Sequence, residues 1–106
     1  MSTTDSFLAM LDKGMDNALL RYSLGNAYFA EKDYGQAVDH FKVALEHDSG
    51  YSAAWKLLGR SYIELGRFHE AVETLQQGIS VASGKGDKQA EKEMSVFLRR
   101  ALKNSE

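Results

Sequence analysis

Histidine, serine and carboxylate side chains are the first candidates for chemistry, and the sequence holds three histidines, His40, His47 and His69. His40 and His47 are seven residues apart and so would lie on one face of a helix. No cysteine and no close pair of carboxylates completes a metal site with them. No nucleophile, base and orienting group occur together in the pattern that catalysis requires. We therefore predict solvated surface histidines, no metal or other cofactor, and no enzyme activity.

The composition describes one domain of 106 residues, of which 43% are hydrophobic. The 13 Lys and Arg side chains against 15 Asp and Glu leave a net charge of −2, which argues against a dedicated nucleic-acid-binding protein. No apolar run approaches the roughly 20 residues that a membrane-spanning helix needs. The N-terminal segment lacks the basic start and apolar core of a secretory signal. We expect a cytoplasmic protein without a membrane or nucleic-acid partner.

The apolar residues recur at three- and four-residue spacing along nearly the whole chain, which predicts helices and no strand. Gly14, Gly66 and Gly84 are expected to end helices, and Asp33 is expected to cap one. Residues 83–86 are expected to form a flexible connector. The six predicted helices span about residues 4–13, 17–32, 34–47, 51–65, 68–82 and 87–103.

The chain also repeats itself, because residues 18–51 align with residues 52–85 at a constant offset of 34 without a gap. The matched positions carry glycine, alanine or large apolar side chains: Leu24-Gly25 with Leu58-Gly59, Tyr28 with Tyr62, Tyr34 with Phe68, Ala37-Val38 with Ala71-Val72, and Phe41 with Leu75. Gly25 and Gly59 have no side chain, so a neighbouring helix can approach closely. Each unit is therefore predicted to be a helical hairpin that buries its apolar face by stacking on its neighbours.

These repeats resemble the tetratricopeptide repeat (TPR) family, whose pattern is a 34-residue helix–turn–helix with Trp, Leu-Gly, Tyr, Ala, Phe, Ala and Pro at fixed places. The second repeat carries the family residues Trp55, Leu58, Gly59, Tyr62 and Ala71. The first repeat departs from the pattern at Arg21, where Trp would stand. Ser49 and Ser83 replace the two terminal prolines.

The resemblance implies an all-α fold, an α-solenoid of two TPR helical hairpins over residues 18–51 and 52–85, in a single domain over residues 1–106. A short N-terminal helix would cover one end of the stack, and a capping helix over about 87–103 would cover the other. Three apolar residues of the capping helix are expected to be buried against the second hairpin: Phe97, Leu98 and Leu102.

The resemblance further implies a protein–protein interaction module, an adaptor that binds a peptide or partner protein in a concave groove lined by the first helix of each hairpin. Helical spacing and the 34-residue equivalence predict six groove residues: Tyr22, Asn26, Phe29, Lys56, Arg60 and Ile63. The aromatic rings offer apolar contact, and the Asn26 amide can pair with a partner backbone. Lys56 and Arg60 suit an acidic or carboxylate-bearing partner.

Other interpretations of these residues stay open. Tyr22 and Phe29 could instead pack on the N-terminal helix, because aromatic stripes at helical spacing often belong to a core. Lys56 and Arg60 could form a solvated face, with Glu64 supporting Arg60 one turn later.

Some TPR domains hold a C-terminal carboxylate with Lys and Asn side chains. Here Tyr22 and Leu57 replace two of them, so that clamp is expected to be incomplete. The alternative to an adaptor is a structural protein that self-associates, with the capping helix of one protomer over the repeats of another; a monomer or a weak homodimer is expected. The last 23 residues carry six Lys and Arg and four Asp and Glu, a mildly basic balance that could attract an acidic partner.

Overall fold

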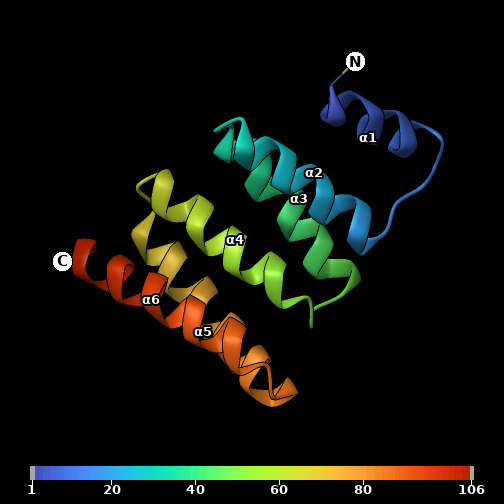
Figure 1. The fold of residues 1–106 in the computed structure, drawn as a ribbon. Helices are drawn as coiled ribbons and strands as arrows, with labels where there is room; N and C mark the ends of the chain where they lie inside the picture. The colour runs from blue at the N-terminus through green and yellow to red at the C-terminus, as the bar shows by residue number, and fades with distance from the viewer. Residues whose placement is uncertain (1, 106) are drawn as a thin grey trace.

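The computed structural model describes residues 2–105, which form six α-helices and no strand (Figure 1). The helices are α1 (Thr3–Asp12), α2 (Ala18–Ala30), α3 (Tyr34–His47), α4 (Ser52–Glu64), α5 (Phe68–Lys85) and α6 (Lys88–Asn104). Each of α1 to α5 contacts the next helix in the chain, and α4 also contacts α2 and α6. Helices α2, α4 and α6 lie in one layer, with α3 and α5 behind them (Figure 1). The all-α prediction is confirmed, and no helix in the described stretch is long and apolar enough to cross a membrane.

The starts of four helices are set by side chains that accept hydrogen bonds from otherwise unpaired backbone N–H groups. These caps are Ser2 for α1, Asn17 for α2, Asp33 for α3 and Asp87 for α6. The prediction that Asp33 caps a helix is therefore confirmed.

The fifth helix differs from its prediction, because it continues to Lys85 and leaves no flexible connector at residues 83–86. Gly84 lies within the helix, where a glycine costs only about 1 kcal/mol relative to alanine. The chain turns at Gly86 instead, whose φ of 73° is left-handed and ends the helix without strain. The Lys85 ammonium donates to the Gly50 carbonyl at 2.6 Å and so joins the end of α5 to the turn before α4.

One glycine in each hairpin sets the distance between its two helices. A Cβ atom at Gly25 would lie 2.5 Å from the Phe41 ring, and a Cβ atom at Gly59 would lie 2.5 Å from the Leu75 side chain. Phe41 and Leu75 are both fully buried. Since no side chain fits at these crossings, the close helix approach predicted from the two glycines is confirmed.

The last helix, α6, docks on the second hairpin through Met94. This side chain is fully buried beside Leu75 and Ala82 of α5. Gly78 makes room for it, because a Cβ atom there would lie 2.6 Å from the Met94 sulfur. The helix therefore covers apolar surface of α5 that water would otherwise reach.

Three residues of α6 were expected to be buried at this contact. Phe97 and Leu98 are half-buried and pack against the same cluster. The expectation for Leu102 is wrong, because 45% of its surface is exposed. Its neighbour Ala101 is fully buried instead, and successive residues of a helix point about 100° apart, which turns Leu102 away from the core.

Replacing Gly59 by leucine should lower the free energy of unfolding by roughly 1–3 kcal/mol or more, because the new side chain has no space against Leu75. Thermal unfolding followed by circular dichroism measures the change. Gly84→Ala is the matched control: its backbone is helical and a new Cβ there would meet no atom within 4 Å, so stability should rise slightly. An unchanged melting temperature for Gly59→Leu would contradict the close crossing.

Truncating Met94 to alanine should lower the free energy of unfolding by about 2–5 kcal/mol, because it leaves a cavity in the buried contact between α5 and α6. Leu102→Ala, on the same helix but half exposed, should cost about 1 kcal/mol or less. Urea denaturation measures both changes. A larger loss of stability for Leu102→Ala than for Met94→Ala would mean that α6 is rotated differently about its axis.

Candidate peptide-binding surface

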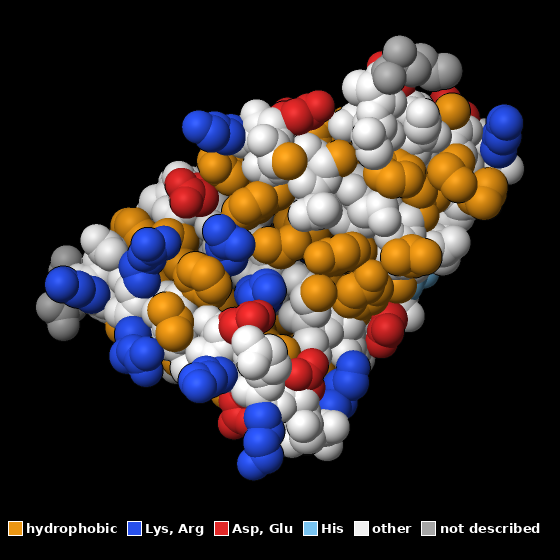
Figure 2. Space-filling model, viewed as in Figure 1, with side chains coloured by type: hydrophobic (Ala, Val, Ile, Leu, Met, Phe, Trp, Pro, Cys, Tyr) orange, Lys and Arg blue, Asp and Glu red, His pale blue; other side chains and the backbone are white. Residues whose placement is uncertain are grey.

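The layer of α2, α4 and α6 presents the residues predicted to line a groove. Figure 2 shows hydrophobic side chains gathered over α2 and α4 on this face, with Lys and Arg side chains among them and along α6. Each predicted residue is exposed or half-buried: Tyr22, Asn26, Phe29, Lys56, Arg60 and Ile63. We call these six residues, together with Phe97 of α6, the groove face. Ile63 has a second role, because it also packs against both hydrophobic clusters of the core.

Arg60 lies between two aromatic rings that come from neighbouring helices. Its guanidinium carbon is 5.1 Å from the Phe29 ring centroid and 4.8 Å from the Phe97 ring centroid, so two cation–π contacts join α2, α4 and α6. We call these three residues the Arg60 stack. The alternative in which Glu64 supports Arg60 does not hold, since no ion pair within residues 2–105 includes Arg60.

Phe97 is the member of the groove face that the sequence analysis missed. The 34-residue pattern ends before α6, so it could not place this ring beside Arg60. The only available signal was the position of Phe97 on the apolar stripe of the last helix.

Lys56 is engaged with α6 rather than free. Its ammonium is 3.0 Å from one carboxylate oxygen of Glu93, and the Gln89 amide donates to the other oxygen at 2.8 Å. These contacts, with the Gln89 hydrogen bond first, hold the pKa of Glu93 below its usual range. A ligand carboxylate would have to compete with Glu93 for Lys56, so the two predicted cations are not equivalent.

Tyr22 belongs partly to the core and partly to the surface. Its ring stacks on Tyr51, with centroids 4.9 Å apart. Together with the exposed Asn26 it also lines a cleft of about 650 Å³ between α1 and α2. Phe29 packs edge-on against Tyr34 of α3, with centroids 5.3 Å apart. The two aromatic residues therefore pack on α3 and the turn after it, and Tyr22 faces the N-terminal helix across a cleft.

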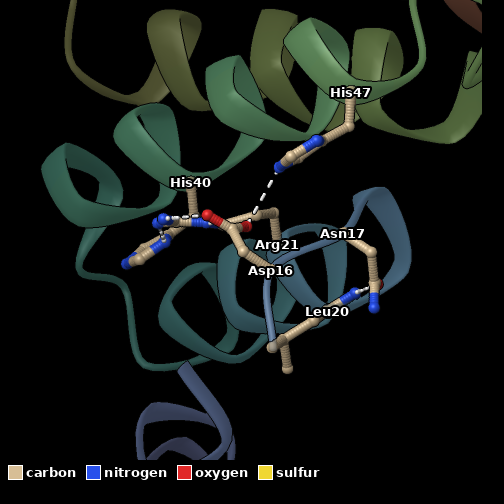
Figure 3. A network of polar contacts seen from close by, with 6 residues as sticks. All are labelled: Asp16, Asn17, Leu20, Arg21, His40 and His47. Carbon is tan, nitrogen blue, oxygen red and sulfur yellow. Dashed lines mark hydrogen bonds and ion pairs between the residues drawn. The ribbon is translucent and has the colours of Figure 1, made fainter. Parts of the chain in front are cut away.

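A polar network joins the start of α2 to α3 (Figure 3). Arg21, which stands where the repeat pattern has Trp, binds both carboxylate oxygens of Asp16 at 2.8 and 2.9 Å. Its guanidinium also lies 3.1 Å from Nδ1 of His40, and Nε2 of His47 reaches the Asp16 carboxylate at 3.0 Å. The hydrogen bonds from Arg21 and His47 lower the pKa of Asp16 to about 2. This network replaces the apolar packing that a tryptophan would supply.

His40 is not the solvated side chain expected from the sequence. Its ring stacks on Tyr28 with centroids 5.4 Å apart, and burial, followed by the charge of Arg21, lowers its pKa. Arg21 and His40 are 19 residues apart and meet only because α2 packs on α3. In the described part of the chain, no group of three or more His, Cys, Asp or Glu residues is placed to hold a metal ion.

Comparisons with known proteins establish the family. The tetratricopeptide repeat profile matches residues 28–84. TPR repeat-containing protein PA0015 of Pseudomonas aeruginosa is 48% identical over 91 residues, which make up 86% of this chain and 87% of that protein. The chain belongs to the tetratricopeptide repeat family. TPR proteins generally mediate protein–protein interactions and are typically non-catalytic.

Solved TPR structures have the same helical arrangement. Protein BPP2914 from Bordetella parapertussis superposes with a TM-score of 0.85 at 38% identity, over 97% of this chain and 90% of that one. The TPR2B domain of yeast Sti1 superposes with a TM-score of 0.87 at 15% identity, over 94% of this chain and 80% of that one. These similarities confirm the TPR fold that the repeat pattern predicted.

Acidification should destabilise this TPR protein through His40 and then through Asp16. Because the pKa of His40 is lowered from 6.5 by folding, its neutral ring contributes stability that is present above pH 6.5 and lost as the pH falls through the lowered pKa. The pKa of Asp16 is lowered from 3.8 to about 2, so a further loss follows over that interval. The melting temperature should fall below pH 6.5, and less steeply for His40→Gln than for the parent.

His69→Gln is the matched control for this measurement, because His69 is exposed on α5. Its melting temperature should follow the pH course of the parent. If His40→Gln followed the parent as well, the network would not be the source of the acid sensitivity.

Proposed function

We propose that this TPR protein is an adaptor that binds an acidic peptide segment of a partner protein on the groove face. The Arg60 stack is the observation that supports this function most directly. Two rings restrict the Arg60 side chain before a ligand arrives, so less conformational entropy is lost on binding. No carboxylate among residues 2–105 pairs with its guanidinium, whose planar N–H donors suit a carboxylate.

The residues around the Arg60 stack would make the other contacts with the bound peptide. Phe29 and Ile63 offer apolar surface beside the cation, and the exposed Asn26 amide can both donate to and accept from a peptide backbone. Lys56 is a secondary contact, because Glu93 already neutralises it. The favoured ligand thus pairs one carboxylate with Arg60 and places an apolar side chain next to it.

A TPR structure of the same fold supports peptide binding through its architecture alone. The yeast Sti1 structure is a complex of its TPR2B domain with pHsp70. The carboxylate clamp of some TPR domains does not carry over, because Leu57 is buried and Tyr22 stacks on Tyr51. The proposed mode of binding therefore rests on Arg60 instead of a clamp.

Self-association is the second candidate function. Large apolar side chains are exposed on α2 and on α6, where Leu19 is 65% and Leu102 is 45% exposed. In such an assembly the capping helix of one protomer would cover the repeats of another. Sedimentation velocity separates the two candidates, since a monomer at high protein concentration would remove the structural one.

Reversing Arg60 to glutamate should weaken binding of the partner at least about tenfold, the equivalent of one charge-assisted hydrogen bond of roughly 1.5–3 kcal/mol. The intact protein would serve as bait, and titration calorimetry would measure the affinity of the retained partner segment. High salt should weaken that affinity in the parent as well.

Lys42→Glu on α3 gives the matched control, because it makes the same charge change on the opposite layer. It should leave the affinity nearly unchanged, and both variants should keep their helical circular dichroism. A partner that binds Arg60→Glu and the parent equally must occupy another surface, and the proposed function would then be wrong.

A further inference from the structure

The far side of α6 is the end of the helix stack. Helices α3, α4 and α5 each contact both of their chain neighbours, whereas α6 has only α5 as a chain neighbour and α4 as a second contact within residues 2–105. In Figure 1, α6 forms the outer edge of the molecule. The side turned away from α5 is therefore where another helix would pack if the stack continued.

Positive charge predominates on this uncovered side. Four cations recur at steps of four, seven and four residues, which places them along one side of the helix, and we call them the basic stripe: Lys88, Lys92, Arg99 and Lys103. All four are exposed, and none forms an ion pair or a side-chain hydrogen bond with another described residue. Figure 2 shows Lys and Arg side chains gathered along this helix.

The acidic residues of α6 and its cap do not neutralise the basic stripe. Glu93 is paired with Lys56 on the groove side, and Asp87 caps the helix start through the Ala90 N–H group. Glu91 is half-buried in the first turn of α6 and forms no ion pair within residues 2–105. Val96 lies in the middle of the stripe and is 51% exposed. The surface is therefore a line of cations with an apolar contact at its centre.

The dimensions of the basic stripe favour one class of partner. Fifteen residues separate its ends, which at 1.5 Å per residue is about 22 Å, the length of a four-turn helix. Residues 1–83 carry seven Lys and Arg against eleven Asp and Glu, so a large polyanion would meet an acidic body beside the stripe. A single acidic helix would contact the stripe alone.

We propose that the far side of α6 docks an acidic amphipathic helix of a partner protein. Its carboxylates would pair with the four cations, and a small apolar side chain would rest on Val96. This site is separate from the groove face, which lies on the layer of α2, α4 and α6, so one chain would hold two partner segments at once.

The test uses the full chain and a synthetic helical peptide with Glu at positions spaced four, seven and four, and Leu at the centre. A second peptide with Gln in place of Glu is the ligand control. At low salt the Glu peptide should bind at least about tenfold more tightly than the Gln peptide. Amide chemical-shift changes should be confined to α6, and absent from Phe29 on α2 and Ile63 on α4.

Arg99→Glu/Lys103→Glu should abolish this preference, and a Lys peptide should restore binding to that variant. Lys13→Glu/Lys42→Glu makes the same change in net charge on exposed residues elsewhere and should bind the Glu peptide like the parent. Circular dichroism checks that both variants fold.

Three results would overturn the proposal. If the Glu and Gln peptides bound equally, or if neither bound, the basic stripe would serve only to keep the end of the stack soluble. An equal loss of affinity for the Glu peptide in both double variants would mean that binding depends only on the net charge of the protein. Tighter binding to phosphatidylglycerol vesicles or to a DNA duplex than to the Glu peptide would assign the stripe to a different class of partner.

Discussion

Each hairpin contains a crossing at which a glycine backbone faces a fully buried side chain, Gly25 against Phe41 and Gly59 against Leu75. The helices are too close at these points for either to rotate without overlap. The rotation of α2 and α4 decides which residues point outward, and the residue after each glycine, Asn26 or Arg60, is a member of the groove face. The glycine crossings inside the hairpins therefore determine which residues form the groove face.

The last helix completes that face as well as covering the core. Met94 packs against the second hairpin. On the same helix, Phe97 stacks on Arg60 and Glu93 forms an ion pair with Lys56. Without α6, Arg60 would lose one of its two rings and Lys56 would lose its counter-ion. The helix that stabilises the end of the stack therefore also sets the electrostatics of the groove face.

The repeat made the two hairpins predictable, because equal positions in a repeat have equal surroundings. It located the glycine crossings and the outward residues of α2 and α4, and it stopped before α6. The exposure of Leu102 and the contact of Phe97 with Arg60 depend on the rotation of that helix, which no repeated position specified. Arg21 and His40 likewise meet only because α2 packs on α3. The prediction that α5 ends at Gly84 was wrong because a helix tolerates a single glycine.

The N-terminal helix α1 contacts α2 alone among the described helices, and Thr4 is its buried residue. Its opening would therefore break only this one contact between helices and would leave the hairpins packed. Such an opening would widen the cleft beside Tyr22 and Asn26. Amide hydrogen exchange in α1 would then follow this local equilibrium, separately from global unfolding of the two hairpins.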